Sequence, residues 1–237
     1  MKIIQLDNYD ALSREAASLI IKELGKNKRA LLCAATGSSP TGTYALLKKH
    51  FDLHPRLFSA LRVIKLDEWG GLPMGNASTC ESYLQEHLTG PLQISSDRYI
   101  SFQSDPKDPA GECERIEQEL KKAGPIDICI LGLGMNGHLA LNEPGLSLET
   151  GPHVAELSNS SLTHPMIGTT GLKPSYGLTL GLTDIFQSAC ILFLISGAKK
   201  KDITAALMKR KISTELPASF LWLHPNVVCL VDREAFA

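Results

Sequence analysis

Short apolar runs alternate with amphipathic helical patterns along the whole chain, and this alternation limits the folds that are open to it. Runs typical of buried strands occur at residues 2–6, 30–34, 62–66, 126–131, 176–180, 189–195 and 227–231. Helical patterns occur at residues 11–24, 41–50, 78–87, 109–122 and 199–209. Such alternation indicates a mainly parallel, open sheet with helices on both faces. We therefore predict one three-layer α/β domain spanning residues 1–237, with an irregular stretch at 143–174.

Composition excludes several functional classes. The net charge is −1, whereas a nucleic-acid partner would require a basic surface, so we predict no nucleic-acid binding. No apolar run approaches eighteen residues and no signal-type segment opens the chain, so no membrane association is expected. The six cysteines form no CxxC pair and four lie in or beside apolar strand-like runs, which favours a reducing compartment. We predict a cytoplasmic protein.

Four polar clusters directly follow predicted strands. In chain order they are Thr36-Gly37-Ser38-Ser39, Asp67-Glu68-Trp69, residues 136–143, and Ser196-Gly197-Ala198-Lys199-Lys200. Ligands of open parallel sheets bind at the carboxyl ends of the strands. The four clusters should therefore converge on one rim of the sheet and form one site.

The first cluster has the character of an anion cradle. Thr36, Gly37, Ser38 and Ser39 enter a predicted helix, where backbone N–H groups and the helix dipole favour a phosphate. The pattern is neither a P-loop nor a GxGxxG fingerprint, and an ordinary helix N-cap loop would use the same residue types. Lys200, which follows another strand, could supply a cation to the same anion.

The second and third clusters carry acid–base groups. Adjacent residues of an extended chain point to opposite sides, so only one of Asp67 and Glu68 should face a ligand. Glu143 could accept a hydrogen bond from His138 and thereby fix its tautomer. The alternatives are a solvated acidic turn and a structural histidine. We find no HExxH pattern and no acidic triplet, so we predict no metal site.

Taken together, residues 35–40, 66–69 and 131–144 resemble the glucosamine-6-phosphate deaminase (isomerising) family, and the segment GHLALNEP within 131–144 is its most specific match. Residues 79–83, 176–182 and 217–224, together with Asn136 and residues 66–69, resemble the galactosamine-6-phosphate deaminase/isomerase branch most closely. The wider superfamily includes 6-phosphogluconolactonases with a GHxAS-type ending, so the ending Asn142-Glu143-Pro144 favours a deaminase.

The resemblance implies a Rossmann-like deaminase fold and a definite reaction. A 2-amino-2-deoxyhexose 6-phosphate would become a ketohexose 6-phosphate plus ammonia, without any metal or organic cofactor. His138 would assist opening of the pyranose ring, and Glu143 would orient His138. Asp67 would move a proton from C2 to C1. The phosphate would be held by Thr36, Gly37, Ser38, Ser39 and Lys200.

Two departures from the family pattern bear on specificity and regulation. Asn136 stands where glucosamine-6-phosphate enzymes usually carry an aspartate, so it cannot relay a proton and could instead bind the sugar or help to select the C4 epimer. No Lys or Arg occurs at residues 139–172, where regulated members place basic residues. We therefore predict no activation by an acetylamino-sugar phosphate, with His164 as the nearest substitute for a phosphate-binding arginine.

The favoured function is thus an isomerising deaminase of galactosamine 6-phosphate, with glucosamine 6-phosphate as the other candidate substrate. A 6-phosphogluconolactonase is the first alternative. A non-catalytic sugar-phosphate sensor is the second, although a sensor needs no acid–base set. The sequence leaves open whether the chain forms a homo-oligomer.

Overall fold

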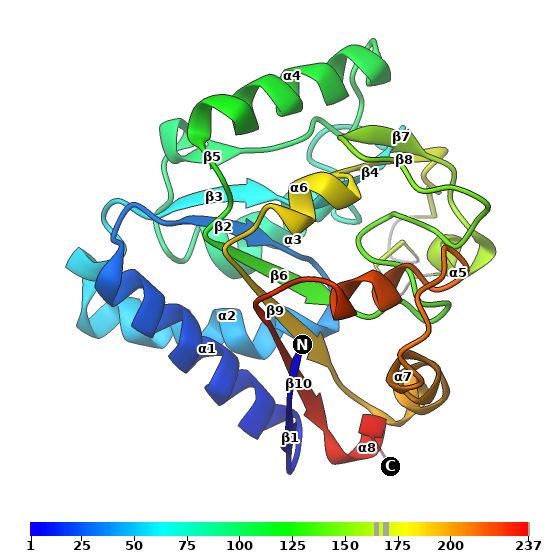
Figure 1. The fold of residues 1–237 in the computed structure, drawn as a ribbon. Coiled ribbons are helices and arrows are strands. Elements are labelled where there is room, and N and C mark those ends of the chain that lie inside the picture. Colours follow the sequence, from blue (N-terminus) through cyan, green and yellow to red (C-terminus); the bar gives the residue numbers. More distant parts are fainter. Residues whose placement is uncertain (164–165, 168–170, 237) are drawn as a thin grey trace.

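A seven-stranded parallel sheet lies at the centre of the computed structural model, which describes residues 1–163, 166–167 and 171–236 (Figure 1). Its strand order is β1-β10-β9-β6-β2-β3-β5, and every neighbouring pair is parallel. The strands are β1 (Lys2–Leu6), β2 (Leu31–Ala34), β3 (Arg62–Lys65), β5 (Tyr99–Ile100), β6 (Ile128–Gly132), β9 (Cys190–Ile195) and β10 (Val227–Asp232). Strands β2 and β6 are neighbours in space but distant in sequence, so the strand order changes direction between them.

Helices cover both faces of this sheet, which confirms the predicted three-layer α/β architecture. Helices α1 (Tyr9–Lys26) and α2 (Ser38–Leu53) pack on one face, and α4 (Pro109–Ala123) and α6 (Leu182–Phe186) lie on the other (Figure 1). Helix α1 starts after Asn8, whose side chain accepts the N–H of Ala11 as an N-cap. The other α-helices of the described residues are α3 (Cys80–Leu84), α5 (Asn159–Leu162), α7 (Lys201–Met208) and α8 (Arg233–Phe236).

A second, antiparallel sheet corrects part of the sequence-based prediction. Strands β4 (Asp67–Gly70), β8 (Tyr176–Thr179) and β7 (His153–Ala155) pair in that order. The predicted strand at 62–66 was expected to end at Asp67, and residues 143–174 were expected to be irregular. The first expectation was wrong because β4 is buried along its whole length and carries two acids, so it shows neither alternation nor an apolar run. The second was wrong at β7 and α5, which are only three and four residues long.

The core is built from the central strands, which are almost completely buried on both faces, as parallel sheets require. Cys33 and Cys129 face each other in the registers of β2 and β6, where they act as small apolar side chains. All six cysteines are free thiols. Within the described part of the chain, no helix has the length and apolarity that crossing a membrane demands.

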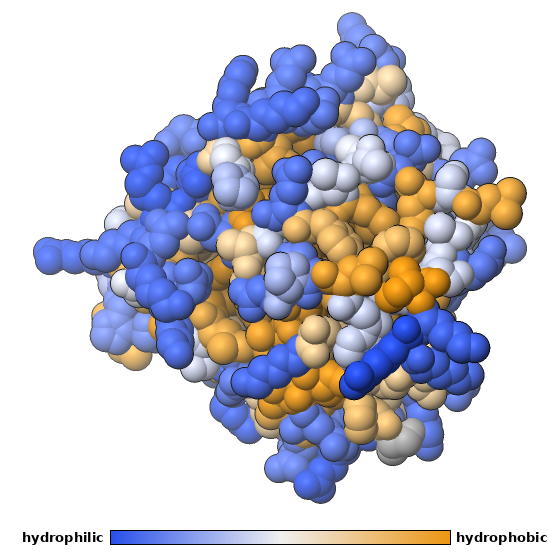
Figure 2. Space-filling view, viewed as in Figure 1, coloured by the Kyte–Doolittle hydropathy of each residue, from blue (hydrophilic) through white to orange (hydrophobic). Residues whose placement is uncertain are grey.

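Helix α6 shields its face of the molecule only in part. Figure 2 shows polar side chains around the edge of this face and apolar ones gathered near its centre, over α6. Within α6, Ile185 is buried, whereas Leu182 and Phe186 are half-buried. They border a groove of about 450 Å³ whose other apolar walls are Leu148 and Phe220. The short α6 therefore leaves apolar surface in contact with solvent.

Candidate active site

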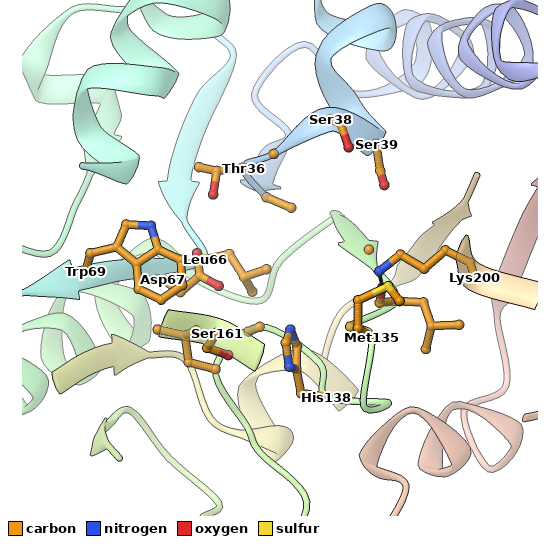
Figure 3. A pocket seen from close by; sticks show the side chains of 17 residues that line it. Thr36, Ser38, Ser39, Leu66, Asp67, Trp69, Met135, His138, Ser161 and Lys200 are labelled. Atoms are coloured by element: carbon orange, nitrogen blue, oxygen red, sulfur yellow. Dashed lines mark hydrogen bonds between the residues drawn. The ribbon is translucent and has the colours of Figure 1, made fainter. Parts of the chain in front are cut away.

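A cavity of about 150 Å³ opens at the carboxyl ends of four adjacent strands, β9, β6, β2 and β3 (Figure 3). It lies where the strand order changes direction between β2 and β6, the usual ligand position in open α/β sheets. All four polar clusters reach it. The cluster residues that line the cavity are Thr36, Gly37, Ser38, Ser39, Asp67, Trp69, His138 and Lys200.

The loop after β2 is held open as a cradle by its backbone. Gly37 has φ +99°, a conformation that favours glycine, and α2 begins at the next residue, Ser38. The carbonyl of Gly37 accepts hydrogen bonds from the hydroxyls of Thr41 (2.9 Å) and Tyr83 (2.8 Å), so the loop is fixed from outside the cavity. These hydrogen bonds use the carbonyl of Gly37 and not the first-turn N–H groups of α2. Those N–H groups are therefore suited to bind an anion.

Lys200 stands at the same end of the cavity as Ser38 and Ser39 in Figure 3, and Asp67 and Trp69 lie toward the other end. Its amine donates to the carbonyl of Leu133, and burial lowers its pKa. The cavity therefore has a hydroxyl- and amine-lined end and a separate end with a carboxylate.

Asp67 and Glu68 point to opposite sides of β4, as the sequence predicts. Asp67 lines the cavity, whereas Glu68 is fully buried and binds Lys65 Nζ at 2.7 Å. The Glu68 carboxylate also accepts the backbone N–H groups of Trp69, Cys80 and Glu81. Burial raises the pKa of Asp67 to about 7; the Glu68 charge adds to this rise, whereas Lys65 and a hydrogen bond from Cys80 oppose it.

His138 and Glu143 form a pair at the floor of the cavity. The His138 Nδ1 atom lies 3.3 Å from Glu143 Oε2. A side chain at Gly134 would place its Cβ 2.3 Å from the imidazole ring, so this glycine is needed for the close packing of His138. Burial alone would raise the pKa of Glu143, but His138, Ser161 and Asn136 outweigh it and bring the pKa down to about 2.

Asn136 lies behind the cavity and not among its lining residues. Its Nδ2 donates to Glu143 Oε2 at 2.8 Å, and its Oδ1 accepts the N–H of His138 at 3.2 Å. Both ends of the amide are thus engaged in holding the His138–Glu143 pair. A direct contact with a sugar would require the amide to give up one of these bonds.

Two serines that the sequence analysis did not identify complete this arrangement. The hydroxyls of Ser158 (2.9 Å) and Ser161 both donate to Glu143 Oε1, and Ser161 also lines the cavity. Ser158 is the N-cap of α5, accepting the N–H of Ser161. The residues Ser158-Asn159-Ser160-Ser161 are typical of a helix N-cap, so the sequence could have predicted the start of a helix here. Nothing in this pattern indicates a contact with Glu143.

The roles assigned from the family resemblance stay predictions at this stage. His164, named as a substitute for a phosphate-binding arginine, lies outside the described residues. Among residues 1–163, 166–167 and 171–236, no group of three or more His, Cys, Asp or Glu side chains could hold a metal ion.

Comparison with known proteins identifies the family. Residues 7–229 match the family described as glucosamine-6-phosphate isomerases/6-phosphogluconolactonase. The chain belongs to this family. AgaI of Escherichia coli (strain K12), which is named as a deaminase, is 41% identical over 228 residues, covering 96% of this chain and 90% of AgaI. A glucosamine-6-phosphate deaminase of Geobacillus sp. (strain WCH70) is 33% identical over 239 residues, covering 100% of this chain and 95% of that protein.

Solved structures agree with this membership. A monomeric glucosamine-6-phosphate deaminase superposes with a TM-score of 0.92 at 33% identity, over 99% of this chain and 98% of that chain. A 6-phosphogluconolactonase from Trypanosoma brucei superposes with a TM-score of 0.78 at 24% identity, over 99% of this chain and 97% of that chain. At this identity the likeness shows only that the two proteins share a fold. The deaminase is described as monomeric. Whether the present chain forms a homo-oligomer therefore stays open.

Proposed function

We propose that this protein is an isomerising deaminase that converts a 2-amino-2-deoxyhexose 6-phosphate to a ketohexose 6-phosphate and ammonia in the cytoplasm. The observation that carries the proposal is the pairing, in one cavity, of a carboxylate with a pKa near 7 and a histidine–glutamate pair, opposite an anion cradle. Deaminases among the relatives at 33% and 41% identity support it.

The cradle would anchor the substrate by its phosphate. Ser38, Ser39 and the first-turn N–H groups of α2 would bind phosphate oxygens, and Lys200 would supply the balancing charge. Thr36 and Gly37 would complete the loop around them. Anchoring the phosphate at this end would direct C1 and C2 of the sugar toward Asp67. Binding would thereby hold the reacting carbons in the orientation that proton transfer requires.

Ring opening would fall to His138. With Glu143 ionised at neutral pH, its carboxylate holds the Nδ1 side of the imidazole and leaves Nε2 for the substrate. His138 would take the proton of the C1 hydroxyl and deliver it to the ring oxygen as the bond between C1 and the ring oxygen breaks, which leaves a carbonyl at C1. Asn136 would contribute indirectly, by holding Glu143 in place.

Isomerisation would fall to Asp67. Its carboxylate would remove the C2 proton of the open-chain sugar and return a proton to C1, through an enolamine. Water would then release ammonia from the resulting ketimine. A base that must also give its proton back works best with a pKa near the working pH, which burial provides here.

Galactosamine 6-phosphate is the substrate we favour, on the resemblance of residues 79–83, 176–182 and 217–224 to that branch. Purified protein should release ammonia from galactosamine 6-phosphate with a higher kcat/KM than from glucosamine 6-phosphate. Hydrolysis of 6-phosphogluconolactone without ammonia release from either amino sugar would instead make the protein a lactonase. Phosphate-sugar binding with neither reaction would make it a sensor.

The same assay tests whether Asn136 selects the epimer. Asn136→Asp would place a second carboxylate next to Glu143, 2.8 Å from its Oε2 if the side chain keeps its place. We expect turnover of both epimers to fall together, because Asn136 holds the His138–Glu143 pair. A change in the ratio of the two kcat/KM values would show that Asn136 contacts the sugar instead.

A further inference from the structure

Cys80 lies between the phosphate loop and the proposed base. It is the first residue of α3 and is 1% exposed. Its sulfur accepts the hydroxyl of Thr36 at 3.4 Å, and its S–H donates to Asp67 Oδ1 at 3.9 Å. Thr36 and Asp67 line the cavity, whereas Cys80 does not, so the thiol joins them from behind the wall.

The position of this thiol is fixed by a buried charge pair. Glu68 Oε1 accepts the N–H of Cys80 at 2.7 Å, and Glu68 Oε2 accepts the N–H of Glu81 at 2.9 Å. Lys65, fully buried, holds the same carboxylate at 2.7 Å. Asp67 and the start of α3 are therefore tied to one group, Glu68, which limits how far Cys80 can move from Asp67.

We propose that Cys80 is a positioning residue of the active site, whose S–H orients the Asp67 carboxylate and whose sulfur couples Asp67 to Thr36 in the phosphate loop. The assignment of a base to Asp67 and of a phosphate to the loop rests on the proposed function. When a phosphate draws the Thr36 hydroxyl away from the sulfur, the thiol keeps its hydrogen bond to Asp67, and the base is oriented as the substrate binds.

The chemical state of the thiol suits this role. Burial raises the pKa of Cys80 well above its usual value, and the nearby carboxylates Glu68 and Asp67 raise it further. The group therefore remains a neutral donor throughout the working range of the enzyme. A sulfur donor is weak, so it can orient Asp67 without suppressing the basicity that burial gives to this carboxylate.

The test compares Cys80→Ala, which removes the donor, with Cys80→Ser, which keeps one. Cys190→Ala, at the half-buried start of β9, is the matched control. Carbon-13 NMR of labelled aspartate follows the titration of Asp67 directly and needs no turnover. Cys80→Ala should raise the Asp67 midpoint by about half a pH unit, because a weak hydrogen bond to the ionised form is lost. Cys80→Ser, which keeps a donor and a stronger one, should not raise the midpoint, and Cys190→Ala should stay within about a fifth of a unit of the unaltered protein.

Coupling to the loop is tested with inorganic phosphate as the probe. Phosphate should move the Asp67 midpoint by a different amount in Cys80→Ala than in the unaltered protein, and Thr36→Val should alter the midpoint without phosphate. An equal response to phosphate in both proteins, or an Asp67 midpoint unmoved by Cys80→Ala, would overturn the inference. Failure of the proposed function would show separately, as absence of ammonia release from the unaltered protein.

The kinetic readout distinguishes positioning from loss of structure. In Cys80→Ala the acidic limb of kcat/KM should move upward with the NMR midpoint, while KM changes less than kcat. If Cys80→Ala does not fold, the Asp67 midpoint is compared by NMR in Thr36→Val, Cys80→Ser and the unaltered protein instead. An equal loss of rate at every pH, unrelieved by Cys80→Ser, would reduce Cys80 to a packing residue and refute the proposal.

Discussion

Two carboxylates serve the same cavity in opposite electrostatic settings. Asp67 has the weak thiol of Cys80 as a side-chain donor and a pKa of about 7. Glu143 is contacted by four side chains and has a pKa of about 2. A pair of acids whose environments drive their pKa values apart indicates a division of labour between a group that exchanges protons and one that keeps its charge.

The difference arises from the elements that carry the two acids. Strand β4 is buried throughout, and its backbone donors nearby are taken by Glu68, so few remain for Asp67. Glu143 lies in a loop where α5 and Asn136 bring three donors to it. The strong hydrogen bonds of the site thus go to Glu143, whose pKa is about 2, and not to Asp67, whose pKa is about 7.

Replacing the titrating acid should have the largest effect. Asp67→Asn keeps the shape of the side chain and removes the base, so kcat should fall by about two to four orders of magnitude. Substrate affinity, measured by calorimetry with galactosamine 6-phosphate, should change by no more than a few-fold. Loss of binding together with loss of turnover would make Asp67 a structural residue. The proposed difference in role between Asp67 and Glu143 would then be wrong.

Replacing the ionised acid should have a smaller effect of a different kind. Glu143→Gln removes the charge that holds His138, and kcat should fall by about a hundredfold, the usual scale for disturbing one acid–base group. Exchange of the C2 proton with solvent, measured on an open-chain substrate analogue, should survive, because Asp67 is untouched. If exchange disappears as well, the two carboxylates do not act on separate steps.

The pH dependence of the unaltered protein follows from the same contrast. Asp67 is an active base only when ionised, and its pKa is about 7, so kcat/KM should fall about tenfold from pH 8 to pH 6. Glu143, with a pKa of about 2, should add no acidic limb above pH 4. A profile that stays flat down to pH 5 would mean that Asp67 is not the group that titrates.

The convergence of these residues on one site could be predicted from sequence, because strand ends in a parallel sheet meet at one edge. Asp67 and His138 follow apolar runs, and their convergence needs only the strand–helix pattern. The surroundings of each acid could not be predicted. The contact of Ser161 with Glu143 depends on the path of the chain between them, where no periodicity exists to read. The burial of β4, which sets the pKa of Asp67, is hidden by the charges of its own first two residues.

The smallest predicted effect tests the donors around Glu143. Ser161→Ala removes one of the two hydroxyls on Oε1, and Asn159→Ala, exposed on the same turn of α5, is the matched control. We expect Ser161→Ala to lower kcat about three- to tenfold, since Ser158, Asn136 and His138 still hold the carboxylate. Ser161→Thr, which restores the hydroxyl, should recover most of the rate, and Asn159→Ala should match the unaltered protein. If both alanine variants lose the same activity, Ser161 contributes only through the fold of α5, and the contacts that hold Glu143 are those of Ser158, Asn136 and His138.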